Sequence, residues 1–264
     1  MSKTPPEVIV ATIAFIIFWL FFVAMIWLVG QRWERLRAFR ARMIAQWRPA
    51  LALTAIYLVS NILAGRSPVN PYALAIFCQV LIGLALARGI AAYEPLTVAR
   101  SLWQRERIAR HLALFVVIGV IAGIIGLLIG SVGMGIARSI FHEVNRTREA
   151  AQAFSVDKAQ AFFLFLSGAG IAEETTYRLV ALSFVWALTG RRWLAILVSA
   201  LVFAAYHLTP LDGMYLTFLK FPISQFLATT LIGIVWGYVF VKRGYETAVL
   251  SHTLSNWIAV LLFM

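Results

Sequence analysis

The chain has 264 residues, of which 62% are hydrophobic and only 13% are charged. A soluble domain carries roughly twice that share of charged residues, so the composition indicates a polytopic membrane protein without a separate soluble domain. The formal net charge is +12, from 23 Lys and Arg against 11 Asp and Glu. Because the basic residues cluster in short segments between apolar runs, they indicate membrane orientation and contact with anionic lipids, and we exclude a nucleic-acid partner.

Apolar segments of spanning length, or nearly so, recur eight times along the chain. They occupy residues 7–30, 49–65, 72–93, 112–141, 161–189, 193–208, 222–241 and 245–264. A helix needs about 20 apolar residues to cross a bilayer, so we predict an all-α fold, a polytopic transmembrane helical bundle of about eight spans. The first segment is too long for a signal-peptide core and lacks a small-residue cleavage site, so we expect an uncleaved anchor.

Two basic segments lie between these spans, at residues 31–48 and 94–110. The first carries six arginines against one acidic residue, and its apolar residues recur at near-helical spacing. We interpret both segments as interfacial helices on the lipid headgroups. The loops after spans one, three, five and seven are basic, whereas the others are weakly or evenly charged. The positive-inside rule then places the basic loops in the cytoplasm and both termini outside.

The fourth predicted span is rich in glycine, which allows neighbouring helices to approach closely. Its glycines are Gly119, Gly123, Gly126, Gly130, Gly133 and Gly135. Residues 142–160 follow as a predicted polar loop. This loop begins His142-Glu143, but Arg146 stands where a zinc-protease H-E-x-x-H motif needs its second histidine, so we discount a zinc site there.

The single cysteine, Cys78, excludes an intrachain disulfide and is expected to be a buried small hydrophobic residue.

The fifth predicted span contains the run Glu173-Glu174-Thr175-Thr176-Tyr177-Arg178. A charge at the bilayer centre costs about 2.5–3.5 kcal/mol on insertion scales, so these ionisable side chains should face a cavity or one another. Glu174 and Arg178 are four residues apart, share a helix face and can pair. Glu173 has no obvious local partner and is our candidate general base. The alternative is a structural polar cluster between helices.

Two later spans add further polar groups. His207 lies near the end of the sixth span, and His252 and Asn256 share one face of the eighth, four residues apart. The chain lacks the residues that other intramembrane proteases need. An aspartyl protease needs two aspartates within the membrane, but Asp157 and Asp212, the two aspartates of the chain, fall in predicted loops. Neither the H-E-x-x-H motif of zinc proteases nor the G-x-S-G motif of rhomboid-like serine proteases occurs. A site built from glutamate and histidine is what remains.

The ordered motifs E-E-x-x-x-R, F-x-x-x-H and H-x-x-x-N, each on its own span, resemble those of the CPBP family. That family contains the type II CAAX prenyl proteases and the related Abi-like bacteriocin-processing and immunity proteins. The resemblance covers about residues 161–264 and implies an intramembrane endopeptidase. It implies that Glu173 is the catalytic glutamate, that His207 helps it activate water, and that His252 and Asn256 stabilise the oxyanion.

Glu174 and Arg178 match the supporting pair of the first motif. This assignment agrees with the chemistry, since peptide hydrolysis needs a base for water and hydrogen-bond donors for the oxyanion. We accordingly divide the chain into residues 1–160, N-terminal transmembrane helices with basic interfacial segments, and residues 161–264, the CPBP-like catalytic core. The expected partners are membrane lipids and a peptide or protein substrate, which is prenylated in the CAAX branch.

A count along straight helices does not bring these residues to one depth. Glu173 would lie about 18 Å from the outer end of its span and His252 about 10 Å from the inner end of its own. His207 would lie near the outer end of the sixth span. Either the predicted ends of the spans are wrong or a helix is broken, tilted or re-entrant, with Gly168 and Gly170 as candidate break points. A cavity open to the cytoplasm would match the CAAX proteases.

Three alternatives remain at this stage. A catalytic zinc with an open fourth position would be satisfied by Glu173, His207 and His252. We favour a metal-free site, because no histidine pair at i, i+4 spacing pre-forms a zinc site. A non-proteolytic membrane scaffold or immunity protein would keep the same polar core. An ion or proton transporter is a third possibility, which the lack of an evident inverted repeat disfavours.

Overall fold

A computed structural model describes residues 6–30, 34–143 and 157–263. Within these ranges the regular structure is entirely helical, which confirms the predicted all-α class. The helices are α1 Pro6–Val29, α2 Glu34–Ala45, α3 Trp47–Leu63, α4 Tyr72–Ala87, α5 Thr97–Gln104, α6 Ile108–Phe141, α8 Lys158–Phe165, η1 Leu166–Glu173, η2 Thr175–Leu182, α9 Ser183–Thr189, α10 Arg192–Tyr206, α11 Tyr215–Phe218, α12 Pro222–Arg243 and α13 Tyr245–Phe263. Most of the predicted loop at 142–160 lies outside the described residues.

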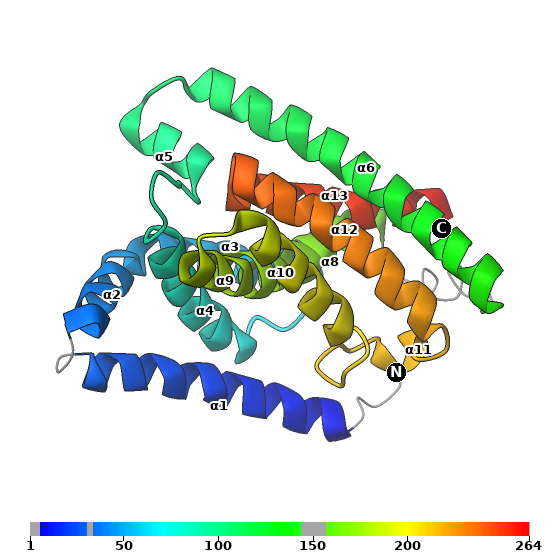
Figure 1. The fold of residues 1–264 in the computed structure, drawn as a ribbon, viewed down its shortest axis with the longest axis horizontal. Coiled ribbons are helices and arrows are strands. Elements are labelled where there is room, and N and C mark those ends of the chain that lie inside the picture. The colour runs from blue at the N-terminus through cyan, green and yellow to red at the C-terminus, as the bar shows by residue number, and fades with distance from the viewer. Residues whose placement is uncertain (1–5, 31–33, 144–156, 264) are drawn as a thin grey trace.

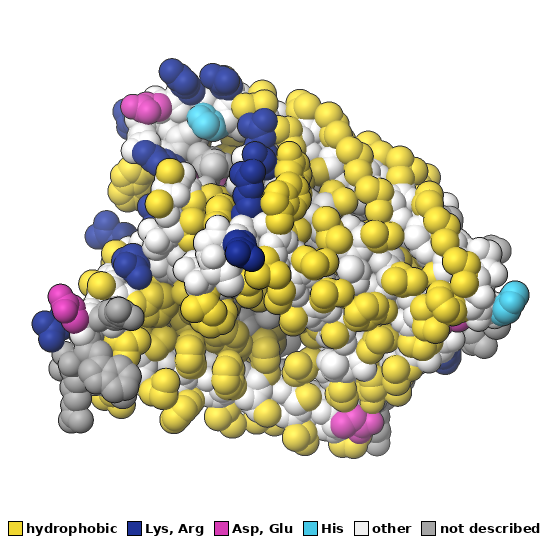
Figure 2. Space-filling view, in the orientation of Figure 1, with side chains coloured by type: hydrophobic (Ala, Val, Ile, Leu, Met, Phe, Trp, Pro, Cys, Tyr) yellow, Lys and Arg dark blue, Asp and Glu magenta, His cyan; other side chains and the backbone are white. Residues whose placement is uncertain are grey.

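A helix occupies each of the eight predicted spans. In the described part of the chain, α1, α6 and α12 are long and apolar enough to cross a membrane, whereas α3, α4 and α10 are apolar but shorter. Hydrophobic side chains cover most of the outer face seen in Figure 2, as expected where lipid rather than water surrounds a protein. The chain is therefore an integral membrane protein, and the number of about eight spans stays a prediction.

The two predicted basic interfacial segments contain helices, although their bounds differ from the prediction. In the first, α2 covers the part from residue 34, and residues 31–33 lie outside the described residues. The second divides between α5 and the first turn of α6, with positive φ angles at Arg105 and Arg107 between them. Lys and Arg gather at the left of Figure 2, where the ribbon in Figure 1 places α2 and α5.

The segment with the acidic run lies inside the bundle. The elements α8, η1, η2 and α9 follow one another without interruption, so the predicted break at Gly168 and Gly170 was wrong. The chain instead widens into two π-helical segments, a geometry that is rare and frequent at functional sites. Gly170 allows η1 to approach α13 closely, because a Cβ atom there would overlap the Thr253 hydroxyl.

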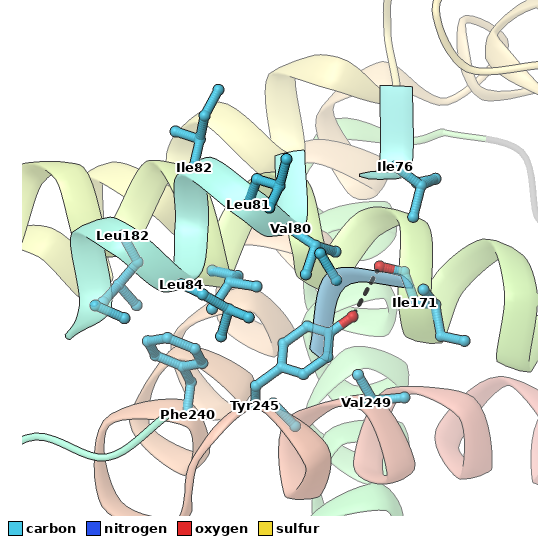
Figure 3. Close-up of a cluster of buried hydrophobic side chains, with 14 of the residues drawn as sticks. Ile76, Val80, Leu81, Ile82, Leu84, Ile171, Leu182, Phe240, Tyr245 and Val249 are labelled. Carbon is cyan, nitrogen blue, oxygen red and sulfur yellow. Dashed lines mark hydrogen bonds between the residues drawn. The ribbon is translucent and has the colours of Figure 1, made fainter. Parts of the chain in front are cut away.

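A buried hydrophobic cluster, drawn in Figure 3, fixes this inner segment against α4, α12 and α13. The Tyr245 hydroxyl points into η1, donates to the Ile171 carbonyl oxygen at 3.3 Å and lies 2.7 Å from the Thr175 hydroxyl. Leu182 and Phe240 are fully buried beside it. The inner segment is thus held in one position next to the helix that carries His252.

The long helix α6 lies across α12 and α13 (Figure 1), and its glycines make that contact possible. A Cβ atom at Gly123 would lie 3.0 Å from the Ser251 carbonyl oxygen on α13, and one at Gly126 would lie 3.2 Å from Trp236 Nε1 on α12. The close packing predicted from the glycine spacing is confirmed at these two positions. Gly135 differs, because a Cβ atom there would meet nothing within 4 Å.

We expect Gly123→Leu to lower the thermal unfolding midpoint of the purified protein, because the new side chain must push α6 away from α13. Overpacking of this kind costs about 1–3 kcal/mol. Gly135→Leu is the matched control, since it makes the same change on the same helix with open space around it. Equal midpoints for the two variants, measured in the same detergent, would contradict close packing of α6 at Gly123.

Candidate active site

One cavity of about 450 Å³ contains all four predicted catalytic residues in its lining. Glu173 ends η1, and His207 directly follows the last turn of α10. His252 and Asn256 come from successive turns of α13. Three segments that are separate in sequence therefore bring a carboxylate, two imidazoles and an amide to one space with room for several water molecules.

The His252 ring stands between the two carboxylates of the acidic run. Its Nδ1 lies 2.8 Å from Glu174 Oε1, and its Nε2 lies 3.7 Å from Glu173 Oε2. One face of the ring stacks on Trp236 with 3.5 Å between the ring centroids. Because an ionised carboxylate only accepts hydrogen bonds, contact with Glu174 puts a proton on Nδ1 and directs Nε2 toward Glu173.

Glu174 and Arg178 form the predicted ion pair, with Nη1 and Oε1 3.2 Å apart and both side chains 0% exposed. The guanidinium also donates from Nη2 to the Gly233 carbonyl oxygen at 3.3 Å and lies over the Phe203 ring. A buried charge needs such partners. The same oxygen of Glu174 therefore contacts both Arg178 and His252, and the second contact could not be predicted from the spacing of the motif.

His207 has a carboxylate neighbour that the sequence analysis missed. Its Nδ1 lies 2.9 Å from the Phe203 carbonyl oxygen, so this nitrogen carries a proton, and its Nε2 lies 3.7 Å from Asp212 Oδ2. The other Asp212 oxygen accepts from the Met214 backbone nitrogen at 2.7 Å. Burial raises the pKa of Asp212 above its ordinary value, while the neighbouring His207 acts to lower it.

Residues 156–258 match the sequence model of a family described as type II CAAX prenyl endopeptidase, Rce1-like. Over this stretch, the chain is similar to the Rce1-like family. The Rce1-like region begins just before α8 and ends after Asn256, so it includes every residue assigned to the site. Searches of curated proteins and of solved structures gave no match. The resemblance stated from the three motifs is confirmed, and it supports a membrane peptide hydrolase.

The short helix α10 explains why straight helices predicted different depths for Glu173 and His207. At 1.5 Å per residue, its 15 residues extend about 22 Å, less than a bilayer core. His207 therefore lies inside the bundle, where it lines the same cavity as Glu173, and the residues that follow it also line the cavity. Asp212, Gly213, Met214 and Phe218 belong to its lining. The segment predicted as a plain loop at 209–221 is thus part of the site and contains the short helix α11.

The predicted zinc alternative requires Glu173, His207 and His252 to be placed around one metal ion. Among the described residues, no group of three or more His, Cys, Asp and Glu side chains is placed to hold a metal ion. Glu173, His207 and His252 line one cavity without forming such a group. Arg66, from the turn between α3 and α4, is a further lining residue that the sequence analysis did not single out.

Proposed function

We propose that the chain is an intramembrane endopeptidase in which Glu173 activates water and His252 and Asn256 stabilise the oxyanion. The observation that carries this proposal is the convergence of these polar groups on one cavity inside an apolar bundle. The similarity of residues 156–258 to the Rce1-like family supports the same reaction class. The substrate class is a peptide or protein chain, and a prenyl group on it is one form to be tested.

The reaction would begin with water placed between Glu173 and the scissile carbonyl group. Glu173 takes a proton as the water oxygen attacks the carbonyl carbon, which leaves a tetrahedral oxyanion. The Asn256 amide can donate to that oxyanion. Since Nδ1–H of His252 is directed at Glu174, His252 donates from Nε2 only when the ring carries both protons.

Collapse of the intermediate breaks the C–N bond and requires a proton on the departing amine. Glu173 holds the proton taken from water and can return it. His207 can donate a proton from Nε2 only when its ring carries both protons, because its Nδ1–H is committed to the Phe203 carbonyl oxygen. Asp212 then acts as a positioning residue, which faces the working nitrogen of His207 across 3.7 Å. The products are a new carboxylate and a free amine.

The direct test is peptide turnover by the purified protein in detergent, with prenylated and unprenylated peptides compared by mass spectrometry. We expect cleavage at one peptide bond and, in H₂¹⁸O, one ¹⁸O atom in the new carboxylate. Addition of a strong zinc chelator should leave the rate unchanged if Glu173 alone activates water. Loss of activity on chelation, with recovery on adding Zn²⁺, would transfer that role to a metal, and no turnover of any peptide would favour the non-proteolytic scaffold.

A further inference from the structure

We infer that the cavity admits its substrate from the side of the membrane opposite the cytoplasm, so that the substrate is a peptide segment exposed on the outer face. That a peptide is cleaved in this cavity rests on the proposed function, whereas the orientation of the cavity in the membrane does not. Two independent features carry the inference: the distribution of charge between the two ends of the bundle, and the end at which the cavity is open.

The first feature is a concentration of basic residues at one end of the molecule. Lys and Arg gather over α2, α5 and the turns after α9 and α12 (Figure 2). These residues include Arg37, Arg40, Arg42, Arg48, Arg88, Arg100, Arg105, Arg107, Arg110, Arg191, Arg192, Lys242 and Arg243. The acidic residues of the same segments are Glu34, Glu94, Glu106 and Glu246. This end therefore carries a large net positive charge.

Hydrogen bonds tie these basic segments to one another, so they form one face. The Arg42 Nε donates to the Ala85 carbonyl oxygen near the end of α4. The Thr97 hydroxyl donates to the Arg243 carbonyl oxygen, and Glu246 accepts from the first turn of α5. The α2 helix, the end of α4, α5 and the turn between α12 and α13 thus lie together at one end of the bundle.

At the opposite end, basic residues are few among those that the structure describes, and acidic residues balance them. Its described charged residues are Glu7, Arg66, Arg138, Glu143, Asp157, Lys158, Asp212 and Lys220. Contacts again join them into one face: Glu143 accepts from the Ser224 backbone nitrogen at the start of α12, and the Tyr215 hydroxyl donates to Glu7. The start of α1 and the end of α13 lie at this end in Figure 1.

The positive-inside rule assigns the basic face to the cytoplasm. The rule applies to Lys and Arg in short loops close to the ends of spans, and every basic segment named above is of that kind. The near-neutral face, with the start of α1 and the end of α13, then lies outside. This is the orientation that the alternation of loop charges predicts, and the structure adds that the basic loops share one face.

The second feature is the open end of the cavity. From Glu173, Trp236 and His252 at its inner limit, the lining continues to Arg66, to Asp212 and Met214, and to Val260 in the last turns of α13. All of these outer lining residues belong to the near-neutral end. None of the described lining residues comes from α2, α5 or the turns after α9 and α12.

The hydrophobic cluster of Figure 3 separates the cavity from the basic end of the molecule. Leu84, Leu182, Phe240 and Tyr245 belong to this cluster, each is at most 1% exposed, and none of them lines the cavity. Packing at interior density leaves no passage for a peptide there. A cytoplasmic peptide, such as a CAAX C-terminus, would therefore meet the closed side of the molecule.

Labelling of single cysteines tests the orientation without any need for activity. In a Cys78→Ala background, Val69→Cys places a thiol at the near-neutral end, at a position that is 79% exposed, and Gln104→Cys places one on the exposed surface of α5. A membrane-impermeant maleimide added to intact spheroplasts should label the first variant and should label the second only after permeabilisation. Labelling of Gln104→Cys from outside, alone or together with Val69→Cys, would overturn the inference.

Cleavage by oriented vesicles then tests the substrate side. An impermeant peptide that detergent-solubilised protein cleaves should be cleaved by right-side-out vesicles at least tenfold faster than by inverted vesicles, and detergent should equalise the two. Faster cleavage by inverted vesicles would overturn the inference. If no peptide is cleaved in detergent, the proposed function fails, while the cysteine labelling still decides which way the cavity faces.

Discussion

Replacing Glu173 by glutamine should abolish peptide cleavage and leave the fold intact. The amide has the same size and fits the same space, but it cannot accept a proton from water. Loss of a positioned general base costs about 10²–10⁴-fold in rate. The fold should tolerate the change, because Glu173 borders the cavity, has a side chain 20% exposed and has its Oε2 3.7 Å from His252 Nε2, too far for a strong hydrogen bond.

The measurements are kcat/KM on the cleaved peptide and the thermal unfolding midpoint in the same detergent. Glu143→Gln is the matched control, since Glu143 lies outside the cavity and accepts hydrogen bonds from the first turn of α12. That control should keep its catalytic rate. Equal cleavage by wild type and Glu173→Gln would reject Glu173 as the general base, and another group would have to activate the water.

Features that depend on one helix could be predicted from the sequence. The eight apolar segments became helices at the expected places, since length and composition suffice to define a helix in an apolar environment. The ion pair of Glu174 with Arg178 followed from their spacing alone, because residues four apart lie on one face of a helix. The ordered motifs also sufficed to recognise the family whose model matches residues 156–258.

Features that depend on how helices meet could not be predicted in this way. The hydrogen bond between Glu174 and His252 joins residues 78 positions apart, and the stacking of His252 on Trp236 joins α13 to α12. Helical periodicity gives faces but no crossing angles, so neither contact was visible. Asp212 was missed for a related reason: its turn was treated as an outer loop because α10 was assumed to reach the membrane surface. An acid five residues after the motif histidine was the available signal.

The geometry also extends the role expected of Glu174. As a partner of Arg178 alone, it would be a structural residue. With its oxygen 2.8 Å from His252 Nδ1, it sets which nitrogen of that ring carries the fixed proton and which faces the cavity. In the proposed mechanism, Glu174 is therefore a positioning residue as well as half of a buried ion pair, and we expect its substitution to affect both stability and rate.

Arg178→Met should be among the most destabilising single substitutions in the chain. Its guanidinium and the Glu174 carboxylate are both 0% exposed, so removing the cation leaves a buried carboxylate without its countercharge. Breaking one partner of such a pair costs about 3–5 kcal/mol. The arginine also loses its hydrogen bond to Gly233 and its contact with the Phe203 ring. We would measure the free energy of unfolding by titration with a denaturing detergent.

A double-substitution cycle separates the charge from the packing. Glu174→Gln alone should destabilise mainly because it leaves Arg178 unpaired. In Glu174→Gln with Arg178→Met no unpaired charge remains, so the double variant should be markedly more stable than the sum of the single losses predicts. Arg88→Met is the control, because the ion pair of Arg88 with Glu94 is partly exposed and such pairs contribute about 0–1 kcal/mol. A loss for Arg178→Met no larger than for Arg88→Met would mean that Glu174 is not held as a buried anion. The fixed proton on His252 Nδ1, which needs an accepting carboxylate, would then have to be reassigned.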